Sequence, residues 1–491
     1  MAVQDSGAQI TDADLDVLRR SLRSMLQSEW PAERAAQRQN DSAALRHVWL
    51  QLARLGLTDS CTVADGGWRI ALLCWAELGR AACPLPLPDA ALALYVIPDR
   101  VRAHLASGSA QIICILPDHA VCKRPLVISD AGELCGRATC VDWSAAATHV
   151  LVVTRTADGG RCALVELPAA GLSCRPQPAL APAPLTSVTF EAVRVAYVDI
   201  DSRTLAELEH IGRFARTVRA LGAAQRAFEL AVDYAKVRRQ FGQPIGRFQA
   251  LQHKLADDHV ALEAVALLVD AAGNALDSRR EDWIMLAAAA TAVAGSGLRQ
   301  LSLDVQQVFG AVGFTEEHEA PLHLRRVFSD LAQLGGARRS RAALARMLFD
   351  DGQTFPELDL GSRAAALRIE VRRWLERNWD AAAKQRERAR PVHQRGVDRE
   401  FSRRLGARGW LGISWPTEYG GLGLTGAEHF AFAQELALAG APVGAHSVAV
   451  DLVAPALIAF GSEAQKCDFL PRILRGELIF SLGYSEAEAG S

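Results

Sequence analysis

The sequence predicts a mostly α-helical protein with one β domain, followed by the start of a second, similar copy. Apolar residues at helical spacing dominate both ends of the chain, and short β-branched runs lie between residues 111 and 203. Residues 363–491 also repeat the pattern of residues 12–117. Two copies at so long a period indicate tandem domains, because solenoid repeats are far shorter.

The first copy divides into three expected domains. Residues 1–110 are expected to form an N-terminal helical domain, because apolar residues recur there every three or four positions. Residues 111–203 are expected to form a middle β domain, and residues 204–350 a C-terminal helical bundle. The first helix is defined by Leu15, Leu18, Leu22 and Leu26, and the expected strands lie near residues 112–116, 148–154, 161–166 and 187–191.

The second copy follows a linker at residues 351–362, which is rich in Gly, Pro and Asp. Residues 363–478 are expected to form a second helical domain, and residues 479–491 the start of a second β domain that is cut short. The offset between copies grows from 349 residues at Trp30 and Trp379 to 358 at Glu77 and Glu435, as expected when loops lengthen between packed helices. Other matched positions are Leu18, Leu22, Met25 and Leu26 with Leu367, Val371, Trp374 and Leu375.

The composition is that of an ordinary globular protein, with half of the residues apolar and 22% charged. A net charge of −2 provides no electrostatic attraction to nucleic acid. The polar N-terminus lacks a signal-peptide pattern, and the apolar run at residues 285–298 is too short to span a bilayer. We therefore expect a cytoplasmic protein without membrane insertion. The ten cysteines show no metal-site spacing, which favours reduced thiols.

Residues 238–249 read Arg-Arg-Gln-Phe-Gly-Gln-Pro-Ile-Gly-Arg-Phe-Gln, and their side chains are suited to contacts with the pyrophosphate or adenine side of a dinucleotide. Arg238 offers a permanently charged fork for phosphate oxygens, and Phe241 offers a flat apolar surface. Gly242 and Pro244 are expected to end the preceding helix, which would place Arg238 in its last turn. A surface arginine before a helix stop would give the same short pattern, so companion motifs decide between the two interpretations.

The segment resembles the R-x-x-F-G-x-P-I-x-x-F-Q signature of the acyl-CoA dehydrogenase family. The resemblance covers nearly the whole chain, and four further segments follow in the family's order. They are residues 77–84 (the end of a first-domain helix), 307–315 (Q-x-x-G-G-x-G-F-T), 416–423 (P-x-E-Y-G-G-x-G) and 485–491 (T-E-P-x-A-G-S-D). The resemblance implies an N-terminal helical domain, a middle β-barrel-like domain, a four-helix C-terminal bundle, and FAD as cofactor. It also implies an acyl-CoA substrate, an electron-transfer flavoprotein or similar acceptor, and a homo-oligomer.

The resemblance implies that the two copies hold different parts of one FAD site. The first copy would donate an arm to a neighbouring cofactor, while the second would hold the flavin. Aligning Gly108 with Gly476 shows that the first copy lacks the flavin-contacting pattern. We therefore expect the first copy to complete a site in the second. The implied FAD contacts are Arg238, Gln240, Phe241, Gln307 and Gly310 in the arm, and Tyr484, Ser485 and Ser491 in the second copy, with Ala311 replacing a family glycine.

The family's reaction needs a glutamate that removes the α-proton of the acyl thioester. The two positions that the family uses for this base correspond in the first copy to Gly212 and Gly335, and glycine cannot take a proton. Glu209 lies close to the first position but is interpreted as an exposed carboxylate at a helix start. The first copy is therefore expected to be catalytically inactive, with the true base lying beyond Ser491.

The implied activity is FAD-dependent α,β-dehydrogenation of an acyl-CoA thioester, and by analogy a bulky, steroid side-chain-like acyl group. Two alternatives stay open: a non-catalytic scaffold or regulatory subunit that completes a partner's FAD site, and an acyl-CoA oxidase or flavin monooxygenase on the same fold. Residues 421–426 spell G-x-G-x-x-G but lack a preceding strand, which excludes a Rossmann site. No third ligand accompanies His318 and His323, so no metal site is expected.

Overall fold

The computed structural model describes residues 10–62, 66–117, 124–183, 185–483 and 488. The chain divides into two compact units, Met1–Phe355 and Pro356–Ser491, and the boundary falls within the segment expected to be a linker.

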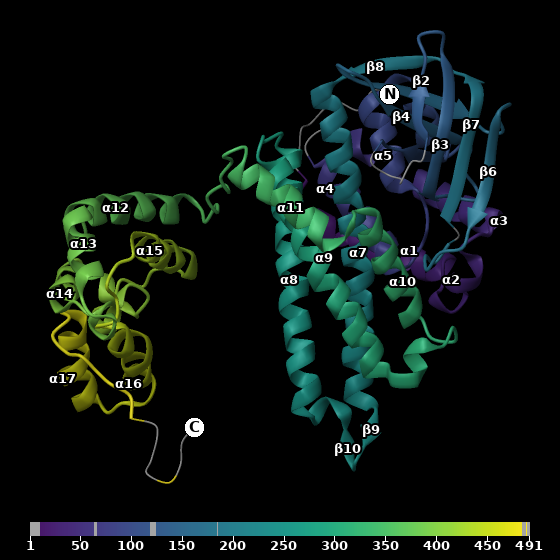
Figure 1. Ribbon diagram of the computed structural model, residues 1–491. Helices are drawn as coiled ribbons and strands as arrows, with labels where there is room; N and C mark the ends of the chain where they lie inside the picture. The colour runs from purple at the N-terminus through teal and green to yellow at the C-terminus, as the bar shows by residue number, and fades with distance from the viewer. Residues whose placement is uncertain (1–9, 63–65, 118–123, 184, 484–487, 489–491) are drawn as a thin grey trace, which may run out of the picture. The chain divides into compact units, whose positions relative to one another are not determined.

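The first unit begins with a domain of six α-helices (Figure 1). Thr11 caps the first helix, since its hydroxyl accepts from the backbone N–H of Asp14 while the Asp14 carboxylate accepts from the Thr11 backbone. Leu22 and Leu26 on the buried face of this helix join a core that extends into the rest of the unit. The helices are α1 (Asp12–Glu29), α2 (Ala32–Arg38), α3 (Ser42–Arg54), α4 (Gly67–Arg80), α5 (Leu87–Val96) and α6 (Pro98–Ala106).

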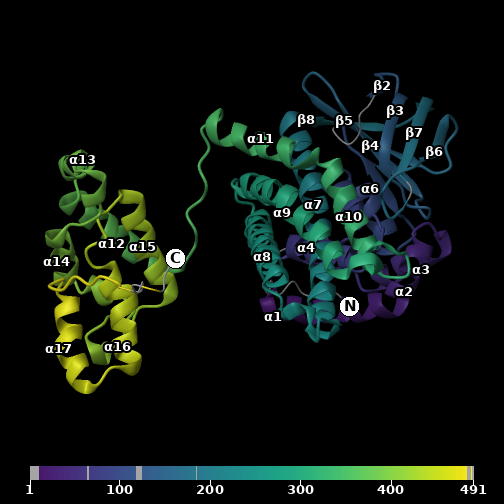
Figure 2. The same cartoon turned by 60° about the horizontal axis from the view of Figure 1, so that its bottom comes forward.

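The β domain consists of two four-stranded sheets, with strand orders β1-β4-β5-β8 and β2-β3-β7-β6 (Figure 2). Only the β1–β4 pair is parallel among the described strands. Alternate residues of the first sheet face opposite ways: Val150 and Val152 join the core with the second sheet, whereas Leu151 and Val153 join the helical core. The strands are β1 (Ile112–Ile115), β2 (Arg124–Ile128), β3 (Glu133–Asp142), β4 (His149–Arg155), β5 (Gly159–Glu166), β6 (Leu172–Gln177), β7 (Leu185–Arg194) and β8 (Tyr197–Asp201).

The C-terminal bundle of the first unit is built on a 36-residue helix, α7. Glycine lets α7 cross α4 at very close range: a β carbon at Gly79 would lie 2.0 Å from the Arg219 carbonyl oxygen, and one at Gly222 would lie 1.9 Å from that of Ala76. A short hairpin joins α7 to α8. The elements are α7 (Ser202–Val237), β9 (Arg239–Gln240), β10 (Gln243–Pro244), α8 (Gln249–Asp277), α9 (Trp283–Phe309), α10 (Ala320–Gln333) and α11 (Gly336–Phe349).

Two stretches of this bundle, α8 and residues 283–314, are long and apolar enough to cross a membrane by length and composition alone. Core helices of folded domains meet the same criterion, and α9 buries Leu298, Leu301 and Val305 inside the first unit.

The second unit repeats the helical domain of the first. Trp30 and Trp379 end their respective first helices with nearly the same backbone angles, φ −131°, ψ 60° and φ −138°, ψ 59°. Gly108 and Gly476 both have a positive φ, 72° and 67°. The elements are α12 (Ser362–Asn378), α13 (Ala381–Ala389), α14 (Arg399–Ala407), α15 (Gly426–Ala439), a π-helical turn (Val448–Val453), α16 (Ala454–Phe460) and α17 (Glu463–Leu474).

The expected fold class, mostly helical with a β domain, is confirmed. The prediction found β1, β4, β5 and β7 but missed the other four strands of the two sheets. The expected second β domain shows no strand in residues 477–483, where no neighbouring strand is described that could accept its backbone hydrogen bonds. Arg238 does not lie in the last turn of α7 as expected: α7 ends at Val237, and Arg238 has extended angles.

Candidate functional site

The arm expected to contact a dinucleotide is the β9–β10 hairpin at the end of α7 (Figure 1). Phe241 and Gly242 form its tip with φ of 50° and 79°, and the Arg239 guanidinium donates to the Gly242 carbonyl at 2.9 Å, which pins the turn. Phe241 is 90% exposed and contacts Phe248 edge-on at 6.0 Å. The tip therefore presents a large aromatic ring to its surroundings beside the exposed cation of Arg238.

Gln307 lies at the same end of the bundle as the hairpin. Tyr234, one turn before Arg238, contacts Phe309 with ring centroids 4.9 Å apart, so the last turns of α7 and α9 are neighbours. Gly310 follows with φ 62° and ψ −136°, and no atom lies within 4 Å of the place where its β carbon would be. The expected arm residues therefore lie at one end of the bundle, with Gln240 in β9.

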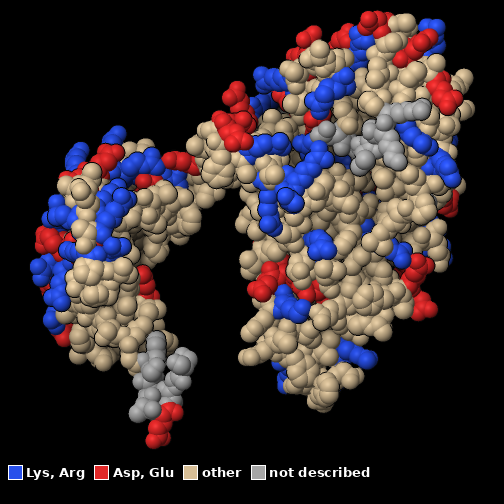
Figure 3. Space-filling model, in the orientation of Figure 1, with Lys and Arg blue, Asp and Glu red and all other residues tan. Residues whose placement is uncertain are grey.

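These residues fit the phosphate groups and a flat ring of an FAD molecule. A guanidinium and a carboxamide are donors for phosphate oxygens, and the exposed ring of Phe241 offers a surface for a flat group. On the face seen in Figure 3, the end of the first unit that carries the hairpin is mainly uncharged, with a few blue groups. Arg238 is exposed, as are Lys236, Arg239 and Arg247 of the same segment.

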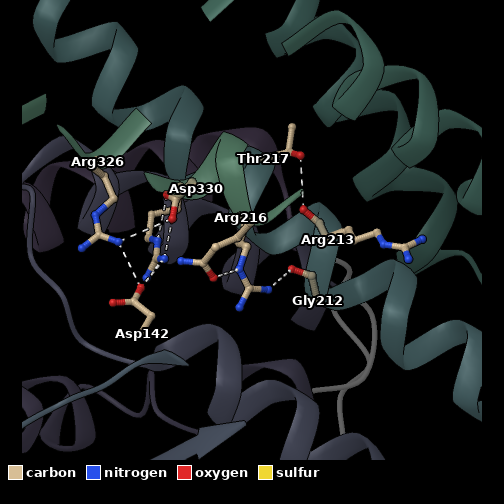
Figure 4. A network of polar contacts seen from close by, with 9 residues as sticks. Asp142, Gly212, Arg213, Arg216, Thr217, Arg326 and Asp330 are labelled. Atoms are coloured by element: carbon tan, nitrogen blue, oxygen red, sulfur yellow. Dashed lines mark hydrogen bonds and ion pairs between the residues drawn. The ribbon is translucent and has the colours of Figure 1, made fainter. Parts of the chain in front are cut away.

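The first expected base position, Gly212, is buried inside α7 and faces packed side chains. A β carbon there would lie 2.7 Å from Leu116 Cδ1 and 3.6 Å from Leu92 Cδ1. The Gly212 carbonyl accepts from Arg216 Nη1 at 2.9 Å (Figure 4), and Arg216 Nε also donates to Gln333 at 2.9 Å. Gly212 has no side chain that could act as a base, and Leu116 and Leu92 fill the space beside it.

The second expected base position, Gly335, caps α11 with φ 79°. A β carbon there would lie 2.5 Å from Arg339 Cδ, and any side chain would be strained by the left-handed backbone. Glu209 differs from the sequence interpretation, because its side chain is only 12% exposed and pairs with Arg155. A carboxylate held in this way is a structural partner of the β domain.

Four buried charges join the β domain to the bundle close to Gly212 (Figure 4). Asp142 at the end of β3 accepts from Arg219 of α7 at 2.7 Å and from Arg326 of α10 at 3.0 Å. Asp330, one turn after Arg326, accepts from Arg219 at 2.6 and 3.1 Å. The four side chains are at most 12% exposed, so the cluster fills space between the two domains with two balanced ion pairs.

The cluster controls the charge state of its members. Burial opposes ionisation of Asp142, but Arg326 and Arg219 outweigh it and hold the pKa of Asp142 below its usual range. Removing one member of such a cluster leaves an unpaired buried charge, which costs about 3–5 kcal/mol. Nearby, burial raises the pKa of Asp89 in α5 to about 7, although the Arg216 charge acts in the opposite direction.

This cluster was not predicted from the sequence, because its members are far apart in the chain. The available signal was an arginine and an aspartate, Arg326 and Asp330, four residues apart on a helix that is otherwise apolar on one side. Arg219 also stands within a run of Ala, Leu and Gly, where a charge requires a partner.

In the second copy, the expected flavin contacts Tyr484, Ser485 and Ser491 lie outside the described residues. The loop before them is described: Gly420 has φ 80°, and a β carbon at Gly421 would lie 2.3 Å from the Trp415 carbonyl oxygen. This loop leads into α15, whose first residues are capped by Thr425, and no strand precedes it. The G-x-G-x-x-G spelling is therefore a loop and helix start rather than a Rossmann turn.

A cavity of about 590 Å³ lies in the second unit between α15 and the π-helical turn. Its walls are mainly apolar, and His429 and Asp451 add polar groups; burial raises the pKa of Asp451. No cluster of three possible metal ligands occurs in the part of the chain that the structure describes. Apolar lining residues include Trp410, Ile413, Phe432, Leu436 and Val450.

Sequence profiles of one family match both units. The profile "Acyl-CoA dehydrogenase, C-terminal domain" matches residues 204–347, and "Acyl-CoA dehydrogenase, N-terminal domain" matches residues 362–477, together just over half of the chain. Acyl-CoA dehydrogenase FadE34 of Mycobacterium tuberculosis is 30% identical over 466 residues, which are 92% of this chain and 61% of that protein. The chain therefore spans about three fifths of the length of this relative.

Two solved structures share the fold. The ChsE4-ChsE5 complex of Mycobacterium tuberculosis superposes with a TM-score of 0.61 at 20% identity, covering 69% of this chain and 98% of the matched chain. A variant of the steroid ACAD Tcur3481-Tcur3483 gives 0.60 at 23% identity, covering 69% and 100%.

Proposed function

The chain belongs to the acyl-CoA dehydrogenase family, and from this premise we propose that it takes part in FAD-dependent α,β-dehydrogenation of an acyl-CoA thioester. In this proposal, the first copy supplies the hairpin arm that completes an FAD site whose flavin-holding face belongs to the second copy. The observation that carries it is the asymmetry of the first copy, in which the arm is exposed while the cleft at Gly212 is packed shut.

Each copy then has its own task. In the first copy, Arg238 binds phosphate oxygens, Phe241 covers a flat face of the cofactor, and Gln307 donates hydrogen bonds. The buried cluster around Asp142 keeps the β domain and bundle in one arrangement, which holds the arm at a fixed place. Bound FAD would supply the acceptor for the hydride that leaves the β carbon of the substrate.

A bulky acyl group is the substrate class proposed, in agreement with the similarity to a steroid ACAD. The cavity of about 590 Å³ beside α15 is not the evidence for it, because its lining includes Ala433 and Ala437. These are the equivalents of Trp75 and Gly79, which lie on the face of α4 that α7 crosses in the first copy.

A scaffold is the second candidate function. The packed surroundings of Gly212 and the strained position of Gly335 leave the first copy without a base, so it would serve only to complete a partner's FAD site. In that case the chain alone would bind no flavin.

The two functions are separated by titrating the purified chain with FAD and measuring bound flavin by absorbance. We expect about one FAD per chain, and an affinity that falls about tenfold in Arg238→Ala, the loss of roughly one charged hydrogen bond. Arg247→Ala, which removes another exposed arginine of the same segment, is the control and should change affinity less than twofold. Absence of binding at about 0.1 mM FAD would contradict an FAD site completed within residues 1–491.

A further inference from the structure

The carboxamide of Gln307 is held by a chain of three polar contacts, two between α8 and α9 and one within α9. Lys254 of α8 donates from Nζ to Gln307 Oε1 at 2.8 Å and to Asp304 Oδ1 at 2.6 Å. The other carboxylate oxygen of Asp304 accepts from Gln300 Nε2 at 2.9 Å. Gln307 was predicted from the sequence, but the residues that hold it were not.

The direction of these contacts fixes which end of the amide faces outward. A lysine ammonium has three donors and no acceptor, so only the oxygen of Gln307 can face Lys254. The amide nitrogen then points away from Lys254, and the structure records no partner for it within the described residues. Gln307 is exposed, so its two N–H groups are presented to the outside at the end of the bundle that carries the hairpin.

The lysine is itself anchored. The Asp304 side chain is 10% exposed, and its two oxygens are engaged on opposite sides by Lys254 and Gln300. Asp258, one turn beyond Lys254, also faces this group, and burial and the Asp304 charge raise its pKa to about 7. The lysine contact is made to Asp304, at 2.6 Å. A partly buried charge-assisted contact of this kind is stronger and better oriented than one in open water.

We propose that Lys254 is a positioning residue that sets the Gln307 carboxamide as a donor toward the acceptor atoms of FAD. This rests on the proposed function, and it deepens it by assigning the orientation of the arm's amide to an ion pair that does not touch the cofactor. Phosphate oxygens and ring nitrogens of a dinucleotide are the acceptors that such an amide serves. Without Lys254 the amide rotates freely and offers its oxygen and nitrogen equally.

The test is a double-mutant cycle in the full chain, with FAD affinity followed by flavin fluorescence. We expect Lys254→Met and Gln307→Ala each to weaken FAD binding about five- to tenfold, and the double variant to be no weaker than Gln307→Ala alone. Lys254→Arg keeps a cation and should retain most of the affinity. Lys236→Met is the matched control: it removes a lysine near the end of α7 that pairs with Asp233, and should leave affinity unchanged. Fold-losses that multiply in the double variant would overturn the proposal.

A second readout does not depend on FAD. In protein labelled with ¹⁵N-glutamine, the side-chain amide of Gln307 should give a rigid heteronuclear NOE that is lost in Lys254→Met and kept in Lys236→Met. A mobile amide in the unmodified chain would overturn the positioning role, whatever the cofactor result. A rigid amide in a chain that binds no FAD would instead contradict the proposed function and leave the lysine–amide contact established.

Discussion

Helix α4 of the first copy and helix α15 of the second occupy equivalent places, and the same ion pair holds each to the first helix of its domain. Arg23 makes two hydrogen bonds to Glu77 at 2.6 and 2.9 Å, and Arg372 makes two to Glu435 at 2.8 and 3.0 Å. The equivalent residues just after the two helices both have a positive φ: 47° at Ala82, two residues after α4 ends, and 62° at Gly440, directly after α15. The internal frame of the domain has been kept in both copies.

The outer faces of these helices differ. Trp75 and Gly79 of α4 are buried in the first unit, where α7 crosses α4. The equivalent positions of α15, Ala433 and Ala437, are exposed, and Leu438 beside them is 74% exposed. The internal ion pair and the turn after the helix are therefore the same in both copies. The residues on the outer face of the helix differ, because α7 covers this face in the first unit.

The hydrogen bonds of the equivalent tryptophans, Trp30 and Trp379, also differ between the copies. The Trp379 indole donates to the Gly440 carbonyl at 3.2 Å. In the first copy, the equivalent carbonyl of Ala82 accepts from Gln39 at 2.8 Å, and the Trp30 indole nitrogen has no partner within the described residues. A single glutamine thus replaces the contact that the tryptophan makes in the other copy.

The largest difference between the units should come from the ion cluster, which has its described members only in the first. Asp330→Ala leaves Arg219 and Arg326 with one carboxylate, and we expect a loss of about 3–5 kcal/mol in the unfolding free energy of that unit. Hydrogen exchange should speed up in α7 and α10 but not in α12–α15. Asp351→Ala, an exposed acid, is the control, and an equal effect of the two variants would show that the cluster contributes nothing.

Asp89 should give the first unit a pH dependence. Because burial raises its pKa to about 7, above the unfolded value of 3.8, the folded state holds the proton more tightly and stability should fall as pH rises from about 4 to 7. Asp89→Asn should remove this fall and be more stable at pH 8, by at most about 4 kcal/mol. Urea unfolding at several pH values measures it. A less stable variant at pH 8 would mean that pairing with Arg216 outweighs burial.

The shared ion pair allows a matched test across the copies. Glu77→Gln and Glu435→Gln should each cost about 1–3 kcal/mol, the usual range for charged hydrogen bonds. The loss should be smaller for Glu435→Gln, since Arg372 keeps Glu357 at 2.9 Å. Chemical unfolding monitored by exchange in α4 and α15 separates the two. A larger loss of stability in Glu435→Gln than in Glu77→Gln would show that the two ion pairs share their geometry but not their energetic contribution.

The smallest expected effect concerns the left-handed residues. Gly440→Ala should cost about 1 kcal/mol, because no atom lies within 4 Å of the new methyl group and only backbone strain remains. Ala82→Gly should change stability little, since the relief of strain is offset by about 0.8 kcal/mol for the lost buried methyl group. Thermal melting of both variants measures this, and a stabilised Gly440→Ala would contradict the strain argument.

The helices were predictable because their apolar spacing and caps are local, as in α1 with Leu15, Leu22 and Leu26. Strand β6 was not, because its Ser-Cys-Arg-Pro-Gln sequence is mostly exposed, and pairing with β7 defines it. Strand β3 is interrupted by Gly136 and Cys140 with positive φ, which breaks the alternation that a sequence search uses.

Part of the candidate site was likewise predictable from the sequence, and part was not. The arm from Arg238 to Phe241 is one continuous motif, so its residues and chemistry were predictable. The ion cluster joins residues separated by 77, 111 and 184 positions, and only tertiary structure brings them together. The role of Lys254 depends on a contact 53 residues away, for which the sequence carried no signal.

The exposed hairpin also affects how the protein associates with itself in concentrated solution. Phe241 is 90% exposed and Phe314, near the end of α9, is 75% exposed, so two large aromatic rings meet water at one end of the bundle. Apolar groups gathered in this way favour self-association as concentration rises. If light scattering per molecule increases with protein concentration, and this increase is smaller in Phe241→Ser, the hairpin tip is the surface through which molecules self-associate.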